Sequence, residues 1–413
     1  MLPFETASSE LAEQKAIRNA LSGKRISAGP SGSPYRGRMD VLPSGRNLFA
    51  TDPLSVPTRA AYAQGIKLAE EFIRRHLQDK GDWPSGVIVD LWGSATMRTA
   101  GEEFAMALHL LGIKPVWADG SERVSGFEIL PLITLDRPRI DVTLRVSGLF
   151  RDVFPTLSNL YQQAIDALSK REESSDWNPY TSGLENARIY GPAPQSYGLG
   201  MGSAPEDFSD TGRRAAAEAW LEASSYAIKG DRVYQDKKGL KDRVTKADSF
   251  VHLQDMPETD LLLSADYAAH EAGFAAAKKF IGGSVSLYHL DNTDPENPTS
   301  RTLAEEIARV VYARACNPNW LTGMKRHGFR GAAEISATLF HMSAFANLAD
   351  VVGPHLFDSY HDATLGNDDI VKFMSEYNPE ALAAMRDCFE KLYHSGLWKT
   401  RRNFILGDLG VSA

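Results

Sequence analysis

The stretch from Val87 to Gly112 constrains the fold more than any other part of the chain. Val87 to Trp92 is a compact apolar run with the length of a buried strand. Gly93 and Ser94 then turn the chain, and the next residues keep their apolar side chains on one helical face until Gly112, a typical helix stop. A buried strand followed at once by a helix predicts an α/β fold.

The residues on either side extend this pattern. The apolar spacing from Thr58 to Leu77 predicts an amphipathic helix before the first strand. Further strands are expected from Pro115, over Phe127–Leu132 and over Ile140–Val146, and a helix is expected at about 154–169. The strand–helix–strand order favours a Rossmann-like layered unit.

Three regions are predicted along the chain. Residues 1–60 form an extended leader, which has a helical pattern at 8–22 and is rich in Gly, Pro and Ser at 23–58. Residues 61–175 form the Rossmann-like α/β region, and residues 176–413 form a mainly helical region. Helical patterns in the last region cover Arg213–Ala227, Tyr267–Phe280, Leu303–Tyr312, Ala332–Asp350, Asp368–Glu376 and Pro379–Ser395.

Charge and composition narrow the class of partner. The formal net charge is −8, and Lys and Arg are spread along the chain, which argues against nucleic acid or an anionic membrane as the main partner. The longest apolar runs are too short to span a bilayer, and the first residues lack the apolar segment of a secretory signal. Cys316 and Cys388 lie far apart in sequence and form no CxxC metal knuckle. We therefore expect a cytoplasmic protein without a membrane span.

Two nucleotide-binding motifs are missing from the sequence. There is no GxxxxGK[ST] loop, so if ATP drives the reaction, another subunit hydrolyses it. GxGxxG is also missing, and only Gly93 and Gly101 flank the turn after the first strand. The hypothesis that the chain is a nucleotide-binding oxidoreductase or transferase is therefore supported by the α/β pattern alone.

Four stretches, in this order and at this spacing, resemble the large subunit of cobaltochelatase and the related H subunit of magnesium chelatase. They are Leu42–Asn47, Leu91–Glu103, Gly126–Pro155 and Asn317–Ala332. The sequences RPRIDVTL and SGLFRD within the third stretch resemble the cobaltochelatase subunit more than the magnesium chelatase subunit. The match corresponds to about the C-terminal third of a full family member.

The resemblance implies an α/β fold and a specific activity. The chain would belong to an ATP-dependent cobaltochelatase, a ligase that forms nitrogen–metal bonds by inserting Co²⁺ into a hydrogenobyrinate-type corrin ring in cobalamin biosynthesis. The resemblance also implies two kinds of partner. They are AAA+ ATPase subunits, which bind ATP and Mg²⁺, and an upstream large-subunit polypeptide. The alternatives are insertion of Mg²⁺ into protoporphyrin and a non-catalytic tetrapyrrole-binding scaffold.

Residues after the first strand are the first candidates for this chemistry. Backbone N–H groups of the strand–Gly–helix unit would bind a substrate carboxylate, and Arg98 would add a bidentate partner. Glu102 and Glu103 are candidate catalytic residues. The alternative is an ordinary turn whose two glutamates only favour the first helical turn through the helix dipole.

Charged residues in and after the next strands are candidate substrate contacts. Glu128 and Arg145 stand among apolar neighbours, and Arg145 shares one strand face with Asp141 and Thr143, although that face is equally consistent with solvent exposure. Arg151 follows Gly148 near a strand end, where α/β proteins form ligand crevices. Asp255 is implied as a substrate contact by the resemblance.

Two histidines and a glutamate are candidates for metal delivery and proton transfer. His270 and Glu271 lie on an expected helix and are the predicted metal ligands, but position 274 is Phe, so the second His of HExxH is missing. Glu271 matches a family glutamate and is also a catalytic candidate. His327 precedes Gly328 in an expected loop and has a side chain suited to proton transfer, or it bonds only to backbone.

Overall fold

The computed structural model describes residues 7–30, 41–49, 52–182 and 187–402. Its centre is an eight-stranded sheet with the strand order β12-β11-β10-β3-β6-β7-β8-β9. Neighbouring strands are parallel from β11 to β7 and antiparallel at both edges. The strands are β3 (Gly86–Leu91), β6 (Asp141–Val146), β7 (Ile189–Gly191), β8 (Tyr226–Lys229), β9 (Arg232–Gln235), β10 (Ser249–Gln254), β11 (Ser286–Asp291) and β12 (Thr299–Thr302).

Alternation along the strands divides the side chains between two helical layers. On β3, Val87 and Val89 pack into a core with α2 (Arg59–Lys80), α4 (Glu102–Leu111) and α7 (Pro155–Leu168). Ile88 packs into the core on the opposite face. That face is covered by α8 (Asp210–Ala223), α9 (Lys237–Lys246) and α11 (Gly273–Phe280). A sheet with helices on both faces confirms the predicted α/β class.

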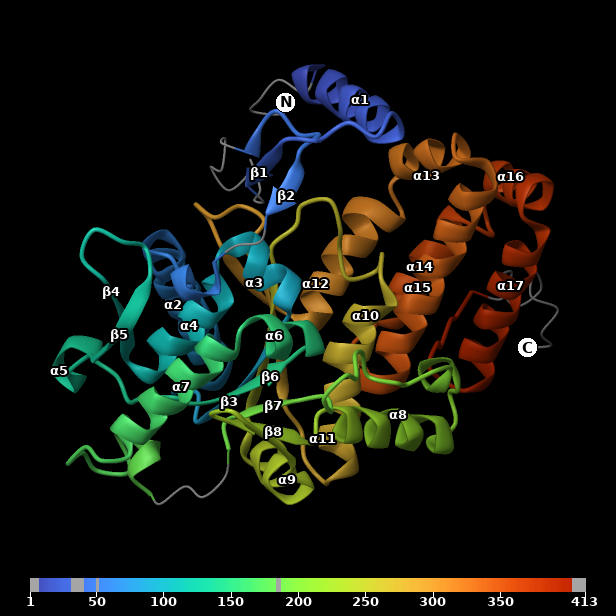
Figure 1. Cartoon of the computed structure of the whole chain (residues 1–413). Coiled ribbons are helices and arrows are strands. Elements are labelled where there is room, and N and C mark those ends of the chain that lie inside the picture. Colours follow the sequence, from blue (N-terminus) through green and yellow to red (C-terminus); the bar gives the residue numbers. More distant parts are fainter. Residues whose placement is uncertain (1–6, 31–40, 50–51, 183–186, 403–413) are drawn as a thin grey trace.

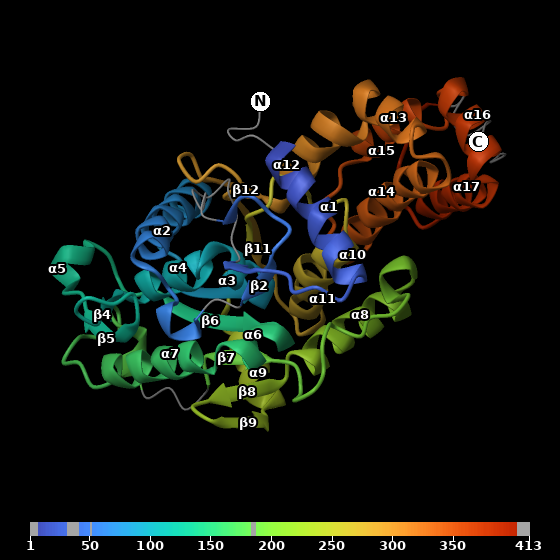
Figure 2. The same cartoon turned by 45° about the horizontal axis from the view of Figure 1, so that its top comes forward.

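The C-terminal part is helical, as predicted, and lies beside the sheet (orange to red in Figures 1 and 2). It begins with α12, which continues into the π-helical turn η7. Its helices are α12 (Leu303–Val310), η7 (Val311–Ala315), α13 (Pro318–Lys325), α14 (Gly328–Ala349), α15 (Pro354–Ala363), α16 (Asp368–Tyr377) and α17 (Pro379–His394).

The remaining elements are short. α1 (Ala7–Leu21) and the parallel pair β1 (Ala28–Pro30) and β2 (Asn47–Phe49) precede the sheet, and residues 31–40 and 50–51 of the predicted leader lie outside the described residues. The other short elements are η3 (Pro53–Ser55), α3 (Gly93–Thr99), β4 (Ile113–Trp117), β5 (Val124–Ile129), α5 (Leu132–Leu135), α6 (Gly148–Val153), η4 (Pro179–Thr181), η5 (Ala204–Glu206), α10 (Ala265–Tyr267) and η6 (Ala268–Ala272).

Two expectations differ from the structure. The strands expected from Pro115 and over Phe127–Leu132 form a separate antiparallel hairpin, β4–β5, at the side of the molecule away from α13–α17 (Figure 1). The main sheet also takes β7 to β12 from beyond residue 175, so its strands come from both sides of that expected boundary. Sequence periodicity misses these strands because they are short or carry polar residues at buried positions, as in SFVHLQ of β10.

Candidate functional site

A row of buried polar side chains crosses the main sheet. The strand register pairs Arg145 with Asp90, Asp90 with His252, and His252 with His289. All four side chains lie on the face covered by α11 and are buried. A row of this kind is unusual in a sheet core, because each buried polar group needs a partner.

Asp90 is the centre of this row. Its carboxylate lies 2.7 Å from Nδ1 of His270 and 3.2 Å from Nη1 of Arg145, and it accepts a 2.7 Å hydrogen bond from Nε1 of Trp92. Burial opposes ionisation of Asp90, but His270, Arg145 and His252 outweigh it and hold the pKa of this carboxyl well below its usual range. Asp90 therefore stays ionised at neutral pH.

The π-helical turn η6 places its two consecutive polar residues differently. His270 faces Asp90 on β3, whereas Glu271 lies 3.1 Å from Nδ1 of His289 on β11. The two predicted metal ligands thus contact different strands, and their role as ligands stays a prediction. Within the described residues, no three His, Cys, Asp or Glu side chains form a group that could hold a metal ion.

A small pocket of about 70 Å³ opens where β3 and β10 end. This volume holds a few water molecules. Its walls come from β3, α3, α4, β10 and α10, which bring together residues distant in sequence. The lining residues are Asp90, Trp92, Ser94, Ala95, Arg98, Glu103, His252, Leu253, Asp255, Met256 and Tyr267.

An ion pair forms part of the lining of this pocket. Nε and Nη2 of Arg98 each donate to a different oxygen of Asp255, both at 2.8 Å. Arg98 lies in the last turn of α3 after β3, and Asp255 directly follows β10, so the pair links two segments that follow adjacent parallel strands. Such bidentate pairs are strong and geometrically specific.

Glu103 and Glu102 begin the same helix but have different surroundings. Glu103 lines the pocket and accepts hydrogen bonds from the hydroxyls of Thr96 at 2.8 Å and Thr99 at 2.9 Å. Burial raises the pKa of Glu103 to about 7. Glu102 instead accepts a hydrogen bond from Asn292 after β11 and does not line the pocket. Only Glu103 combines access to the pocket with a pKa near neutrality.

Three other predicted residues lie outside this pocket. Glu128 is on the exposed hairpin, 3.6 Å from Lys114. His327 is exposed and precedes α14. Arg151 is buried and donates to the carbonyls of Pro192 and Ala193, so it holds that loop against α6.

Arg145 occupies an intermediate position. Its side chain is only 3% exposed and is engaged by Asp90. Arg145 is therefore in place to orient Asp90 and His270, while direct contact with a substrate would require this salt bridge to open.

Sequence reasoning missed Asp90, His252 and His289. Each interrupts a run of buried strand positions with an ionisable side chain, as in GVIVDL, SFVHLQ and SLYHLD. The sequence signal that could have identified them is an ionisable residue within an otherwise apolar strand pattern. The strand register that aligns the three residues is visible only in the structure.

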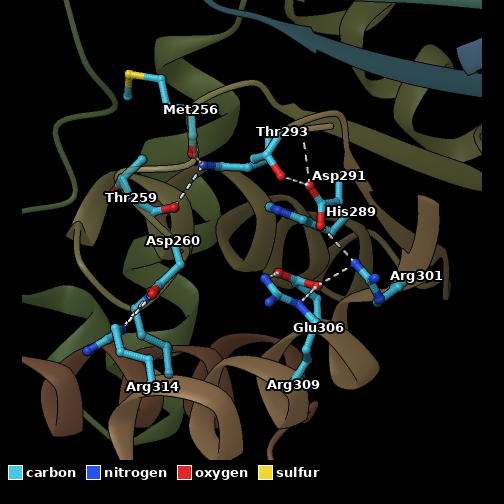
Figure 3. Close-up of polar contacts among 12 residues, drawn as sticks. Met256, Thr259, Asp260, His289, Asp291, Thr293, Arg301, Glu306, Arg309 and Arg314 are labelled. Atoms are coloured by element: carbon cyan, nitrogen blue, oxygen red, sulfur yellow. Dashed lines mark hydrogen bonds and ion pairs between the residues drawn. The ribbon is translucent and has the colours of Figure 1, made fainter. Parts of the chain in front are cut away.

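A second set of ion pairs joins residues at and after the ends of β10 and β11 to α12 and η7. Figure 3 shows Arg301 between Asp291 and Glu306, with Nη1 at 3.1 and 3.2 Å from their oxygens. Glu306 on α12 also binds Arg309. In the same view, Arg314 binds Asp260, five residues beyond Asp255. Arg301 thus links the end of β11 to α12, and Arg314 on η7 contacts the loop after β10 outside the pocket.

Comparisons with known proteins agree on one family. The family model described as CobN/Magnesium Chelatase matches residues 4–405. The chain is 39% identical to an aerobic cobaltochelatase subunit CobN of Sinorhizobium sp, over 98% of this chain and 34% of that protein. It is 40% identical to the subunit of the same name from Pseudomonas aeruginosa, over 94% of this chain and 33% of that protein.

More distant and structural relatives complete the comparison. The chloroplastic magnesium-chelatase subunit ChlH of Oryza sativa subsp. japonica is 26% identical over 94% of this chain and 29% of that protein. The solved catalytic subunit of cobaltochelatase from Mycobacterium tuberculosis superposes with a TM-score of 0.90 at 32% identity, covering 97% of this chain and 36% of that one. The chain spans about a third of the length of the curated relatives it matches. None of the described helices is long and apolar enough to cross a membrane.

Proposed function

Because the chain belongs to the CobN/magnesium chelatase family, we propose that it is part of an ATP-dependent cobaltochelatase. The reaction is insertion of Co²⁺ into a hydrogenobyrinate-type corrin ring in cobalamin biosynthesis, a ligase reaction that forms nitrogen–metal bonds. The higher identity to cobaltochelatase subunits than to magnesium-chelatase subunits favours this over insertion of Mg²⁺ into protoporphyrin.

The observation that carries the proposal is the buried carboxyl of Glu103 in the pocket beside Arg98 and Asp255. Metal insertion displaces the N–H protons of the ring, so the site needs a base. A carboxyl whose pKa is raised to about 7 is partly ionised at neutral pH and is matched to this task. His252 lines the same pocket, with its Nδ1 3.5 Å from the Asp90 carboxylate, so its ring is a second candidate proton acceptor.

The volume of the pocket limits what this chain does alone. A cavity of about 70 Å³ is far smaller than the roughly 300–1,000 Å³ usual for organic ligands. The macrocycle would therefore lie across the pocket mouth, with its remaining surface covered by an upstream large-subunit polypeptide. This fits a chain that spans a third of the length of its relatives.

The free energy of ATP hydrolysis would be supplied by other subunits. The sequence has no phosphate-binding GxxxxGK[ST] loop. We assign ATP and Mg²⁺ to AAA+ ATPase partners in the cytoplasm. A non-catalytic tetrapyrrole-binding scaffold is the second candidate, since no group suited to hold a metal ion occurs within the described residues.

A titration followed by absorbance tests the ligand class. The purified chain, with and without the upstream polypeptide, is titrated with hydrogenobyrinic acid diamide, protoporphyrin and NADH. We expect a saturable spectral shift with the corrin, a weaker one with protoporphyrin, and none with NADH. Saturable binding of NADH without any response to either tetrapyrrole would contradict the proposal.

A further inference from the structure

The Arg98–Asp255 pair is asymmetric toward solvent. The side chain of Arg98 is 30% exposed, whereas that of Asp255 is 6% exposed. Arg98 is therefore the more accessible member of the pair, and its Nε and Nη2 already hold a carboxylate. Asp255 occupies the position that an incoming carboxylate would take.

The same pair shares the pocket with the candidate bases. Glu103 and His252 line the pocket and are buried. The ion pair joins the segment after β3 to the segment after β10, the two strands between which the pocket opens. Separating Arg98 from Asp255 would remove this link between the two segments beside the pocket.

Separation is unfavourable unless another anion replaces Asp255. A half-buried guanidinium without its carboxylate loses two charge-assisted hydrogen bonds. A carboxylate on a ligand restores both in the same fork geometry, whereas an ester or amide carbonyl provides only a neutral acceptor. Once the mouth is open, water reaches Asp255 and solvates it.

We propose that Arg98 and Asp255 form an exchangeable lid that makes the pocket selective for tetrapyrroles with a free carboxylate. The ligand carboxylate takes the place of Asp255 on Arg98, and the mouth then opens toward Glu103 and His252. This inference rests on the proposed function and adds to it a determinant of substrate specificity.

Two probes with the same macrocycle test the exchange: protoporphyrin IX and its dimethyl ester, titrated into the chain with tryptophan fluorescence as the readout. We expect the wild type to bind the acid more tightly than the ester. Asp255→Asn should bind the acid at least about tenfold more tightly than the wild type, because the competing charge is gone, and should leave the ester unchanged. Arg98→Gln should reduce the affinity for the acid to that for the ester.

The matched control is Asp260→Asn, which removes the carboxylate from another bidentate arginine pair on the same loop, outside the pocket (Figure 3). It should change neither affinity. Equal binding of acid and ester by the wild type would overturn the lid while leaving a tetrapyrrole site intact. Weaker binding of the acid by Asp255→Asn would also overturn it. Failure of both probes to bind any variant would overturn the lid, whereas the titration with hydrogenobyrinic acid diamide tests the tetrapyrrole site separately. Melting temperatures identify any variant that fails to fold.

Discussion

Glu103 is the residue whose surroundings decide most about the chemistry of the pocket. Its carboxyl is fully buried, faces two threonine hydroxyls and has no arginine or lysine among its hydrogen-bond partners within the described residues. Burial therefore raises its pKa from 4.5 to about 7. An acid with a raised pKa holds its proton longer in the folded than in the unfolded chain, so its contribution to stability is complete below pH 4.5 and is lost as the pH rises through about 7.

This gives a pH-dependent stability prediction. Glu103→Gln removes the titration, so the difference in unfolding free energy, mutant minus wild type, should grow in favour of the mutant between pH 5 and 8, by on the order of 3 kcal/mol at most. Denaturant unfolding at a series of pH values measures it. A difference that stays constant over this range would show that Glu103 is ionised throughout.

The neighbouring glutamate provides a contrast in activity. Glu103→Gln should lower chelation by the assembled complex at least about 100-fold, as loss of a general base usually does. Glu102→Gln should mainly cost stability, on the order of 1 kcal/mol, since it weakens a buried hydrogen bond to Asn292. Initial rates of chelation, normalised to the amount of folded protein, distinguish the two variants. Wild-type turnover by Glu103→Gln would remove that residue from the mechanism.

The sequence predicted the pocket only in part. Arg98, Glu103 and Asp255 were predicted as site residues and meet at one pocket, because they lie in segments that follow adjacent parallel strands. Glu128 and His327 were predicted on equal grounds and lie elsewhere. Motif spacing indicates which loops matter, but the pairing of β3 with β10, which are more than 150 residues apart, decides which side chains meet.

At the scale of elements, the contact of α2 with α4 positions the helix that carries Glu103. Gly65 on α2 faces the backbone of Ala105 and Met106, and a Cβ placed there would lie 2.6 Å from the amide nitrogen of Met106. Only a glycine permits this approach of the two helices. The position of α4 over the pocket thus depends on a residue outside the site.

Gly65→Ala should accordingly destabilise the protein by about 1–3 kcal/mol, because α2 must move away from α4. Gly323→Ala on α13 is the control: a Cβ there meets nothing within 4 Å, so the higher helix propensity of alanine should leave stability unchanged or raise it by up to about 1 kcal/mol. Thermal or urea unfolding measures both. Equal effects of the two substitutions would show that α2 and α4 adjust freely.

Long amphipathic helices were predictable and short strands were not. The patterns at 58–77 and 379–395 correspond to α2 and α17, because one apolar stripe faces one core. The stretch predicted as one helix over 213–227 ends earlier, at Ala223, and Tyr226 already starts β8. A strand of four residues has too few alternations to be told from the end of a helix.

At the scale of the whole molecule, the proposed function makes the chain one part of a multi-subunit complex. We predict that the purified chain does not hydrolyse ATP, because its sequence has no phosphate-binding loop. Release of inorganic phosphate should equal the buffer background at every ATP concentration. Phosphate release that co-elutes with the chain through several columns and saturates with ATP would contradict this.

The most direct test of the account is cobalt insertion in a reconstituted mixture of this chain, the upstream polypeptide, the ATPase subunits, ATP, Co²⁺ and hydrogenobyrinic acid diamide. Formation of the cobalt corrin is followed by its absorbance, with each component left out in turn. We predict insertion only in the complete mixture, and its loss when Glu103→Gln replaces the wild-type chain. Insertion by this chain alone without ATP, or full activity of the complete mixture with Glu103→Gln, would contradict the account.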